Sequence, residues 1–199
     1  SDYRYHVAEP VLSEFEKYVR EDLIEDLQDI LLHVDPQAGR RGELLDRELT
    51  KLADRYARQV SPGSLHKIRY YIRRDLLGYN RIDPLLNDHR LEDISCDGAD
   101  VPVYVYHDAY RDLQTNISFP EQDLNSFVVR MAQRSGRHIS VADPMVDASL
   151  PNGSRVQLTL GRQVSTRGSN FTIRQFSELP ITPIDLINWG TFSVETMTY

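Results

Sequence analysis

The chain has 199 residues, of which 27% are charged and 40% are hydrophobic, and its formal net charge is −7. This length allows one large domain or two small ones, and it can bury a sizeable core without disulfides. The acidic balance argues against a dedicated nucleic-acid binder. Cys96 is the only cysteine in the sequence, which excludes an intramolecular disulfide and a cysteine-rich metal site.

The sequence has no signal peptide and no apolar run that approaches the length of a membrane-spanning helix. These features and the single cysteine are compatible with an intracellular location. The chain begins at Ser1 rather than at a methionine and stops inside a predicted helix. We therefore expect it to be a segment of a longer protein.

Charge is distributed in blocks along the chain. The net charge is −7 over residues 1–54, +5 over 55–78, −7 over 79–125 and +5 over 126–176. Arginine outnumbers lysine 20 to 3, so most positive groups are planar guanidiniums suited to bidentate phosphate or carboxylate binding. Such blocks are typical of solvated helix faces. Alternatively, a basic block forms a patch that binds an anion or an acidic surface.

The first part of the chain carries a helical pattern. After an extended lead-in of about ten residues, apolar residues recur at steps of three and four over 12–31, 44–60 and 65–77. This spacing predicts three amphipathic helices joined by short breaks. Two serines precede the first and third helices as potential N-caps, Ser13 and Ser61.

The second part carries a strand pattern. Short β-branched and aromatic runs predict strands at 94–96, 103–106, 113–119 and 171–176. A helix is predicted from Pro120 to Ser135-Gly136 because proline suits a first helical turn and acids follow it. Prolines then mark a linker, after which short helices are expected from Thr182-Pro183 and from Ser193.

A hairpin is predicted in the stretch "VDASLPNGSRVQLTLG", residues 146–161. Alternation places Arg155 on one face of the return strand with Gln157 and Thr159, and places Arg174 on one face of the next strand. If the apolar faces are buried together, both arginines lie on the opposite face, where an anion can reach them. The alternative for either arginine alone is a surface residue with no role.

Several catalytic and metal-binding patterns are absent from the sequence. There is no G-x-x-x-x-G-K-[ST] phosphate loop, and none of the six histidines pairs with another at metal-ligand spacing. Cys96 lies beside Asp97, which argues against a nucleophilic thiolate. Asp143 and Asp147 resemble an acid–base pair, but a turn residue and a solvent-side strand residue explain them better.

A cluster of aromatic and basic residues lies in the third predicted helix, at Tyr70-Tyr71 and Arg73-Arg74. It is compatible with stacking on nucleic acid. The alternative, which helical spacing favours, is one buried ring, one exposed ring and two solvated arginines.

The predicted fold class is α+β, because turns join the strands more often than helices do. We expect an N-terminal helical bundle over residues 1–80 and an antiparallel sheet domain with helices over 81–178. Residues 179–199 are expected to form a linker and the start of a further domain.

From Arg81 onward the sequence resembles the archaeal branch of the type II/IV secretion ATPases, the GspE, PilT and FlaI class. The resemblance covers about 120 residues, and the first 80 match only loosely. It is carried by four stretches, "YNRIDPLLNDHRLEDISCDG" (79–98), "HISVADPMVDASLPNGSRVQLTLG" (138–161), "GSNFTIRQF" (168–176) and "PITPIDLINWGTFSVE" (180–195).

This resemblance implies that residues 81–178 are a PAS-like N-terminal domain followed by a RecA-like motor domain, in a hexameric ring that hydrolyses ATP. ATP is then expected between the two domains, with arginines of the sheet reaching its phosphates. Matching the motifs assigns this role to Arg155 and Arg174, and Arg162 is a further candidate for phosphate binding.

The resemblance also implies cofactors, partners and a location. ATP and magnesium are expected in the full-length protein, whereas this segment, which lacks the phosphate loop, is expected to bind neither tightly and to be inactive alone. The expected partners are its own motor domain, five further copies and a membrane platform protein of a secretion or pilus system. The expected location is cytoplasmic, peripheral at the inner face of the cell membrane.

Two other hypotheses remain open from the residues. The acidic helical region is alternatively a protein-interaction module that docks the ATPase to its membrane partners without nucleotide contact. A nucleic-acid binder is the third hypothesis, and the net charge argues against it.

Overall fold

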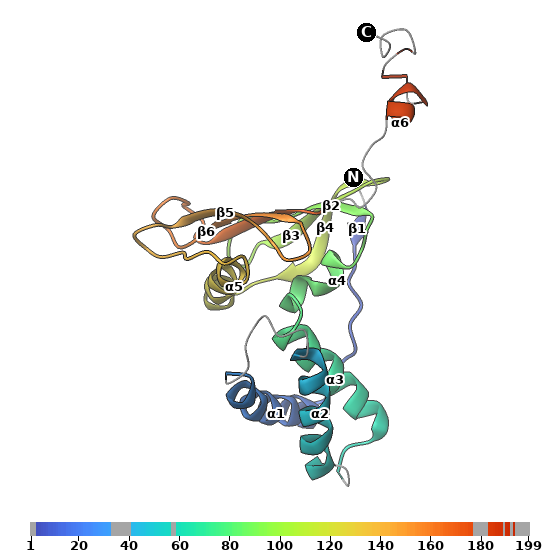
Figure 1. The fold of residues 1–199 in the computed structure, drawn as a ribbon, viewed down its shortest axis with the longest axis vertical. Coiled ribbons are helices and arrows are strands. Elements are labelled where there is room, and N and C mark those ends of the chain that lie inside the picture. Colours follow the sequence, from blue (N-terminus) through green and yellow to red (C-terminus); the bar gives the residue numbers. More distant parts are fainter. Residues whose placement is uncertain are drawn as a thin grey trace. The chain divides into compact units, whose positions relative to one another are not determined.

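The computed structural model describes residues 3–32, 41–56, 59–176, 183–188, 190–191 and 193. The chain divides into two units, a helical unit (Arg4–Asp88 with Thr115–Ile117) and a sheet unit (Ser1–Tyr3, His89–Gln114 and Ser118–Tyr199). Helices and antiparallel strands occur together, so the predicted α+β class is confirmed (Figure 1). The domain boundaries expected at residues 80 and 178 stay predictions.

The helical unit is built from three helices, α1 (Glu14–Leu32), α2 (Arg41–Ala53) and α3 (Pro62–Leu76). Short 3₁₀ turns η1 (Asp54–Tyr56) and η2 (Asn80–Ile82) and the one-turn helix α4 (Asp83–Leu86) follow in chain order. Burial of aliphatic side chains stabilises this unit, at about 1.5–3 kcal/mol for each fully buried residue. Its core consists of Leu12, Val19, Leu23, Leu27, Leu45, Leu49, Val60, Ile68 and Ile72. None of the described helices is both long and apolar enough to cross a bilayer.

Both predicted serine caps are present. The Ser13 backbone N–H donates to Glu16 Oε2 (2.7 Å), and the Glu16 N–H donates to Ser13 Oγ (3.2 Å), which is a reciprocal capping box. Ser61 Oγ accepts from the Ser64 N–H (3.1 Å) with Pro62 in the first helical turn. These bonds satisfy backbone donors that a helix N-terminus otherwise leaves unpaired.

Glu16 also links α1 to α3, because Lys67 Nζ lies 3.4 Å from its Oε1 atom. The Ser64 hydroxyl, then the Ser13 backbone and Lys67, hold the pKa of this carboxyl down, from 4.5 to about 2. A depressed folded-state pKa means that the stabilisation is present above pH 4.5 and is lost as the pH falls towards 2.

We therefore expect the Glu16→Gln variant to lose less stability than the wild type on acidification below pH 4.5. Urea unfolding followed by α-helical circular dichroism at several pH values measures this difference. Ser64→Ala should reproduce part of the effect. Parallel pH profiles for Glu16→Gln and the wild type would contradict the assigned role.

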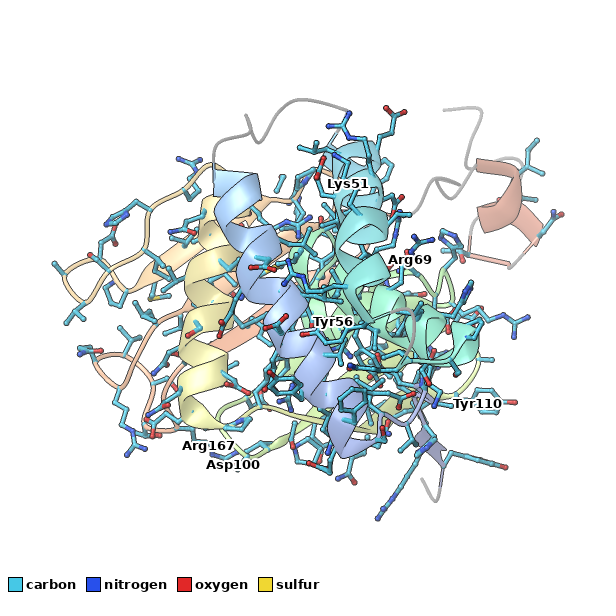
Figure 2. The ribbon with its side chains drawn as sticks, turned by 90° about the horizontal axis from the view of Figure 1, so that it is seen from below. Lys51, Tyr56, Arg69, Asp100, Tyr110 and Arg167 are labelled. Carbon is cyan, nitrogen blue, oxygen red and sulfur yellow. The ribbon has the colours of Figure 1, made fainter. Side chains whose placement is uncertain are left out.

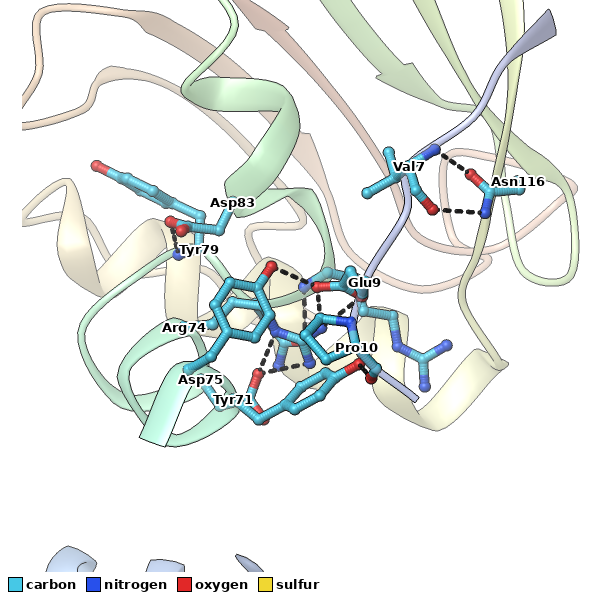
Figure 3. Close-up of polar contacts among 12 residues, drawn as sticks. Val7, Glu9, Pro10, Tyr71, Arg74, Asp75, Tyr79, Asp83 and Asn116 are labelled. Carbon is cyan, nitrogen blue, oxygen red and sulfur yellow. Dashed lines mark hydrogen bonds and ion pairs between the residues drawn. The ribbon is translucent and has the colours of Figure 1, made fainter. Parts of the chain in front are cut away.

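The lead-in segment before α1 is fixed by specific polar contacts (Figure 3). The Val7 backbone exchanges two hydrogen bonds with the Asn116 side-chain amide, at 2.8 and 3.0 Å. Glu9 accepts two bonds from Arg74 Nη1, at 2.7 and 2.8 Å, and the Tyr71 hydroxyl donates to the Pro10 carbonyl (2.6 Å). The expected extended lead-in is therefore pinned to α3.

Arg74 corrects one expectation, since only Arg73 of the arginine pair is solvated. The Arg74 side chain is 8% exposed and also pairs with Asp75 at 2.8 Å. Its guanidinium stacks on the Tyr71 ring, 4.6 Å from the centroid. Tyr70 and Tyr71 are both half-buried and pack edge to face, which departs from the expected one buried and one exposed ring.

Within the described residues, the sheet has seven strands in the order β1-β4-β3-β2-β7-β6-β5. The pairs β4–β3, β3–β2, β2–β7, β7–β6 and β6–β5 are all antiparallel. The strands are β1 (Arg4–Tyr5), β2 (Leu91–Cys96), β3 (Pro102–His107), β4 (Arg111–Ser118), β5 (Met145–Ser149), β6 (Arg155–Thr159) and β7 (Asn170–Arg174). The strands and the hairpin predicted from alternation are thus present, and the two-residue β1 was not predicted. The short helix expected at Pro183 is α6 (Pro183–Asn188), and most of the one expected from Ser193 lies outside the described residues.

Helix α5 (Glu121–Arg134) lies against one face of the sheet at β6 and β7 (Figure 1). Phe127 of α5 packs with Phe119 and with Phe171 of β7, and the ring centroids are 5.0–6.0 Å apart. The alternate residues of β6 and β7 that point to this face are buried, namely Val156, Leu158, Phe171 and Ile173. The other residues of these strands therefore lie on the opposite face, which we call the open face.

Candidate anion site on the open face of the sheet

Arg155 and Arg174 lie directly opposite each other across the β6–β7 pairing. Both side chains are exposed, and both belong to the open face because their sequence neighbours Val156 and Ile173 are buried in the core. Alternation predicted that the two arginines share a face, and the register adds that they are cross-strand neighbours. Residues so placed have Cβ atoms about 4.5–5.5 Å apart, so one multivalent anion can reach both guanidiniums.

Arg174 is oriented by a carboxylate on the other neighbouring strand. Asp93 of β2 is its cross-strand partner, and Arg174 Nε donates to Asp93 Oδ1 at 3.0 Å. This hydrogen bond raises the pKa of the Arg174 guanidinium further above its usual range. The side chain remains 75% exposed, so the ion pair does not remove it from solvent.

Asp93 was missed by sequence reasoning. The β2–β3 register shifts between Leu91 and Asp93, and both Glu92 and Asp93 escape the core as a result. A bulge of this kind breaks strict alternation and re-aims a side chain. Two consecutive acids in a strand pattern are the signal that marks such a break in the sequence.

Arg155 differs from Arg174 in having no carboxylate beside it. Its other cross-strand neighbour is Ser149 of β5. Within the described part of the chain, no ion pair or hydrogen bond engages the Arg155 side chain. Like charges directly opposite each other in a sheet are destabilising, so this pair is suited to an anion that neutralises both.

The repulsion makes a stability prediction. Arg155→Thr should raise the free energy of unfolding of the sheet unit by about 0.2–1 kcal/mol, because it removes a like-charge cross-strand pair. Arg174→Thr should give no such gain, since it also removes the bond to Asp93. Differential scanning calorimetry measures both variants, and equal destabilisation by the two would contradict the proposed repulsion.

Arg162 is not part of this arginine pair. It follows the opposite end of β6 from Arg155, in the loop before β7, and its Nε and Nη2 atoms lie 3.2 and 3.4 Å from the Glu121 carboxylate. Glu121 begins α5, which covers the other face of the sheet. The structure therefore brings together two of the three arginines that sequence analysis selected.

Neutral polar groups adjoin the arginines on the open face. The next cross-strand row consists of Gln157, Thr172, Ser95 and Tyr104 from four neighbouring strands, and the exposed Asp147 of β5 pairs with Gln157 at its edge. Their amide and hydroxyl groups donate and accept hydrogen bonds. The open face thus offers two guanidiniums beside amide and hydroxyl groups, with Asp93 and Asp147 as its nearby carboxylates. The arginines suit the phosphates of a ligand, and the neutral groups suit a polar remainder.

Other candidates from the sequence do not assemble a site. Cys96 is buried, and this burial raises the pKa of its thiol. Asp143 lies in a turn where its N–H donates to Ser140 Oγ (3.2 Å), and Asp147 is exposed on β5. Among the described residues, no group of three or more His, Cys, Asp or Glu side chains is placed to hold a metal ion. The arginine pair therefore remains the candidate site.

No family model matches the chain. It is similar to three uncharacterized proteins of Methanocaldococcus jannaschii. MJ1288 is 36% identical over 167 residues, which cover 81% of this chain and 66% of that protein. MJ0900 is 37% identical over 142 residues (71% of this chain, 26% of that protein), and MJ0781 is 40% identical over 114 residues (57% and 16%).

Among solved structures, the VirB11 ATPase from the Brucella suis type IV secretion system, in complex with sulphate, is 23% identical. The superposition has a TM-score of 0.46 and covers 58% of this chain and 34% of that one. Among the curated relatives, the chain spans just under two thirds of the length of MJ1288, about a quarter of that of MJ0900 and about a sixth of that of MJ0781.

Proposed function

We propose that the sheet unit is one half of a nucleotide clamp in a secretion or pilus-assembly ATPase, and that Arg155 and Arg174 bind the phosphates of ATP. The observation that carries this proposal is the cross-strand arginine pair on an open, polar face. The sequence motifs around the two arginines support it, because they resemble the motifs of the secretion ATPases.

The two arginines have different parts in this proposal. Arg174 is held by Asp93 through Nε, which leaves its two terminal nitrogens available for a phosphate. Arg155 is a second guanidinium that needs a counter-charge. A triphosphate supplies charge to both at once, and bidentate arginine–phosphate bonds are about twice as strong as neutral hydrogen bonds.

The remaining parts of the assignment follow from the same proposal. A RecA-like motor domain supplies the phosphate loop and binds magnesium, and the sheet unit closes over the ATP bound there. Six copies form the working ring, at the inner face of the membrane, where closure moves a platform protein. The sheet unit is a PAS-like domain in this proposal.

The proposal is tested on this chain with inorganic tripolyphosphate, titrated by isothermal calorimetry or NMR. We expect weak binding that Arg155→Ala and Arg174→Ala each reduce by about tenfold, the loss of roughly 1.4 kcal/mol of charge-assisted bonding. Arg137→Ala is the matched control, because Arg137 is an exposed arginine beyond the end of α5. An equal loss in all three variants would show non-specific charge attraction and would overturn the site.

A further inference from the structure

Helix α1 carries aromatic side chains on its solvent side. Its core residues Val19, Leu23 and Leu27 are buried, whereas Phe15 is 45% exposed and Tyr18 is 60% exposed. Residues three apart on a helix are neighbours, so the two rings form one patch. Val11, four residues before Phe15, is 83% exposed. The packing of the helical unit therefore leaves a large part of each of these side chains exposed to solvent.

Acidic residues run along one side of the two rings. Glu14, Glu21 and Glu25 are exposed and lie three, four or seven positions from Tyr18, on the same side of the helix. Only two basic residues of α1, Lys17 and Arg20, oppose its seven acidic ones. The patch of Phe15 and Tyr18 with these three glutamates is called the aromatic–acidic face below.

Internal contacts also reach the side of α1 that carries the two rings, because Asp22 lies four positions after Tyr18 and seven after Phe15. Arg55 Nη1 lies 2.8 Å from Asp26 Oδ2 and 3.6 Å from Asp22 Oδ2. The Tyr56 hydroxyl donates to Asp22 at 2.7 Å, and Figure 2 shows Tyr56 beside α1. These acids are therefore used within the unit. On the aromatic–acidic face, Glu14 pairs with Lys17 at 2.6 Å and Glu21 with Arg20 at 3.5 Å, and such exposed pairs are weak. Glu25 has no ion pair among the described residues. With seven acids and two bases, α1 keeps a surplus of negative charge, and Glu25 is an exposed and unpaired part of it.

We propose that the aromatic–acidic face of α1 is a docking surface for an arginine- or lysine-bearing amphipathic segment of a protein partner. Charge complementarity identifies this occupant, because cationic side chains both pair with the glutamates and stack on the exposed rings. An apolar side chain between the basic ones covers Phe15 and Tyr18. A partner helix that binds this face would contact it through side chains spaced three and four residues apart.

Other occupants fit the same surface less well. Nucleic acid and an anionic bilayer are repelled by the glutamates. A second copy of this chain meets like charge if α1 packs on α1. A partner segment with positive charge avoids both penalties. This surface lies in the helical unit and does not depend on the arginine pair of the sheet unit.

The test uses a synthetic amphipathic helical peptide of leucine and arginine, with a control peptide in which glutamate replaces arginine. NMR titration of the whole chain should show shifts confined to α1 with the basic peptide and none with the acidic one. Phe15→Ala/Tyr18→Ala, and separately Glu21→Gln/Glu25→Gln, should each lower the affinity by about fivefold or more. Because these positions are exposed, we expect each variant to fold. A dispersed amide spectrum checks this.

Matched controls separate docking from general attraction. Glu43→Gln removes an exposed carboxylate of α2, and Tyr110→Ala removes an exposed ring of the sheet unit. Both should keep the affinity within about twofold. The proposal is overturned if the peptide does not bind or if the aromatic variants bind it as the wild type does. It is equally overturned if those variants abolish self-association in sedimentation or binding to anionic vesicles, because either result identifies another occupant.

Discussion

Replacing Arg155 or Arg174 with alanine, in a protein that joins this chain to a phosphate-loop motor domain, is expected to lower ATP turnover by a factor on the order of 10² or more. Guanidiniums aimed at a transferring phosphoryl group stabilise the charge that develops there. Their loss should therefore reduce kcat rather than only raise KM. Steady-state hydrolysis over a range of ATP concentrations distinguishes the two effects.

The double variant sharpens this prediction. If both arginines bind the same phosphates, their effects on turnover should be strongly non-additive. Arg162→Ala serves as the internal comparison, because Arg162 lies at the other end of β6 and is paired with Glu121. Turnover that is unchanged in Arg155→Ala and in Arg174→Ala would contradict the phosphate role.

Arg74→Ala is expected to destabilise the helical unit by about 2–3 kcal/mol, the largest stability effect that we predict. Arg74 is 8% exposed and bonds Glu9, while the Tyr70 hydroxyl donates to the same carboxylate at 2.8 Å. Removing the guanidinium takes its charge away from Glu9 and Asp75 and breaks the two bonds from Arg74 that hold Glu9 of the lead-in segment to α3. Urea unfolding followed by circular dichroism measures the loss.

Arg73→Ala is the matched control for this loss, one residue away on the same helix. Arg73 is 45% exposed and pairs with Asp46, which is itself 39% exposed. Exposed pairs contribute about 0–1 kcal/mol. A double-mutant cycle with Glu9→Ala should show coupling of about 1–3 kcal/mol for Arg74. Equal effects of Arg73→Ala and Arg74→Ala would show that burial of the Arg74 pair does not matter.

Local patterns in the sequence predicted the elements that carry the site. The alternation of Arg155 with Val156, and of Ile173 with Arg174, assigns each arginine to the face opposite the core. The serine caps were predictable for the same reason, because a capping bond joins residues only three apart. Both signals lie within a few residues of chain.

Contacts between distant residues were not predictable in this way. Asp93 and Arg174 are 81 positions apart, and Glu9 and Arg74 are 65 positions apart. The register of a sheet and the packing of a lead-in segment decide which side chains meet, and helical or strand spacing carries no information on either. Helical spacing alone therefore predicted a solvated Arg74. In the structure Arg74 is buried, and it pairs with Glu9 and Asp75.

The proposed function requires direct contact between the guanidiniums of the open face and a polyphosphate. The most direct measurement is the ¹⁵N–¹H spectrum of the arginine Nε groups, recorded with and without a saturating concentration of magnesium ATP. We expect the Nε signals of Arg155 and Arg174 to shift and that of Arg162 to stay in place. Shifts at Arg162 alone, or none at Arg155 and Arg174, would contradict it.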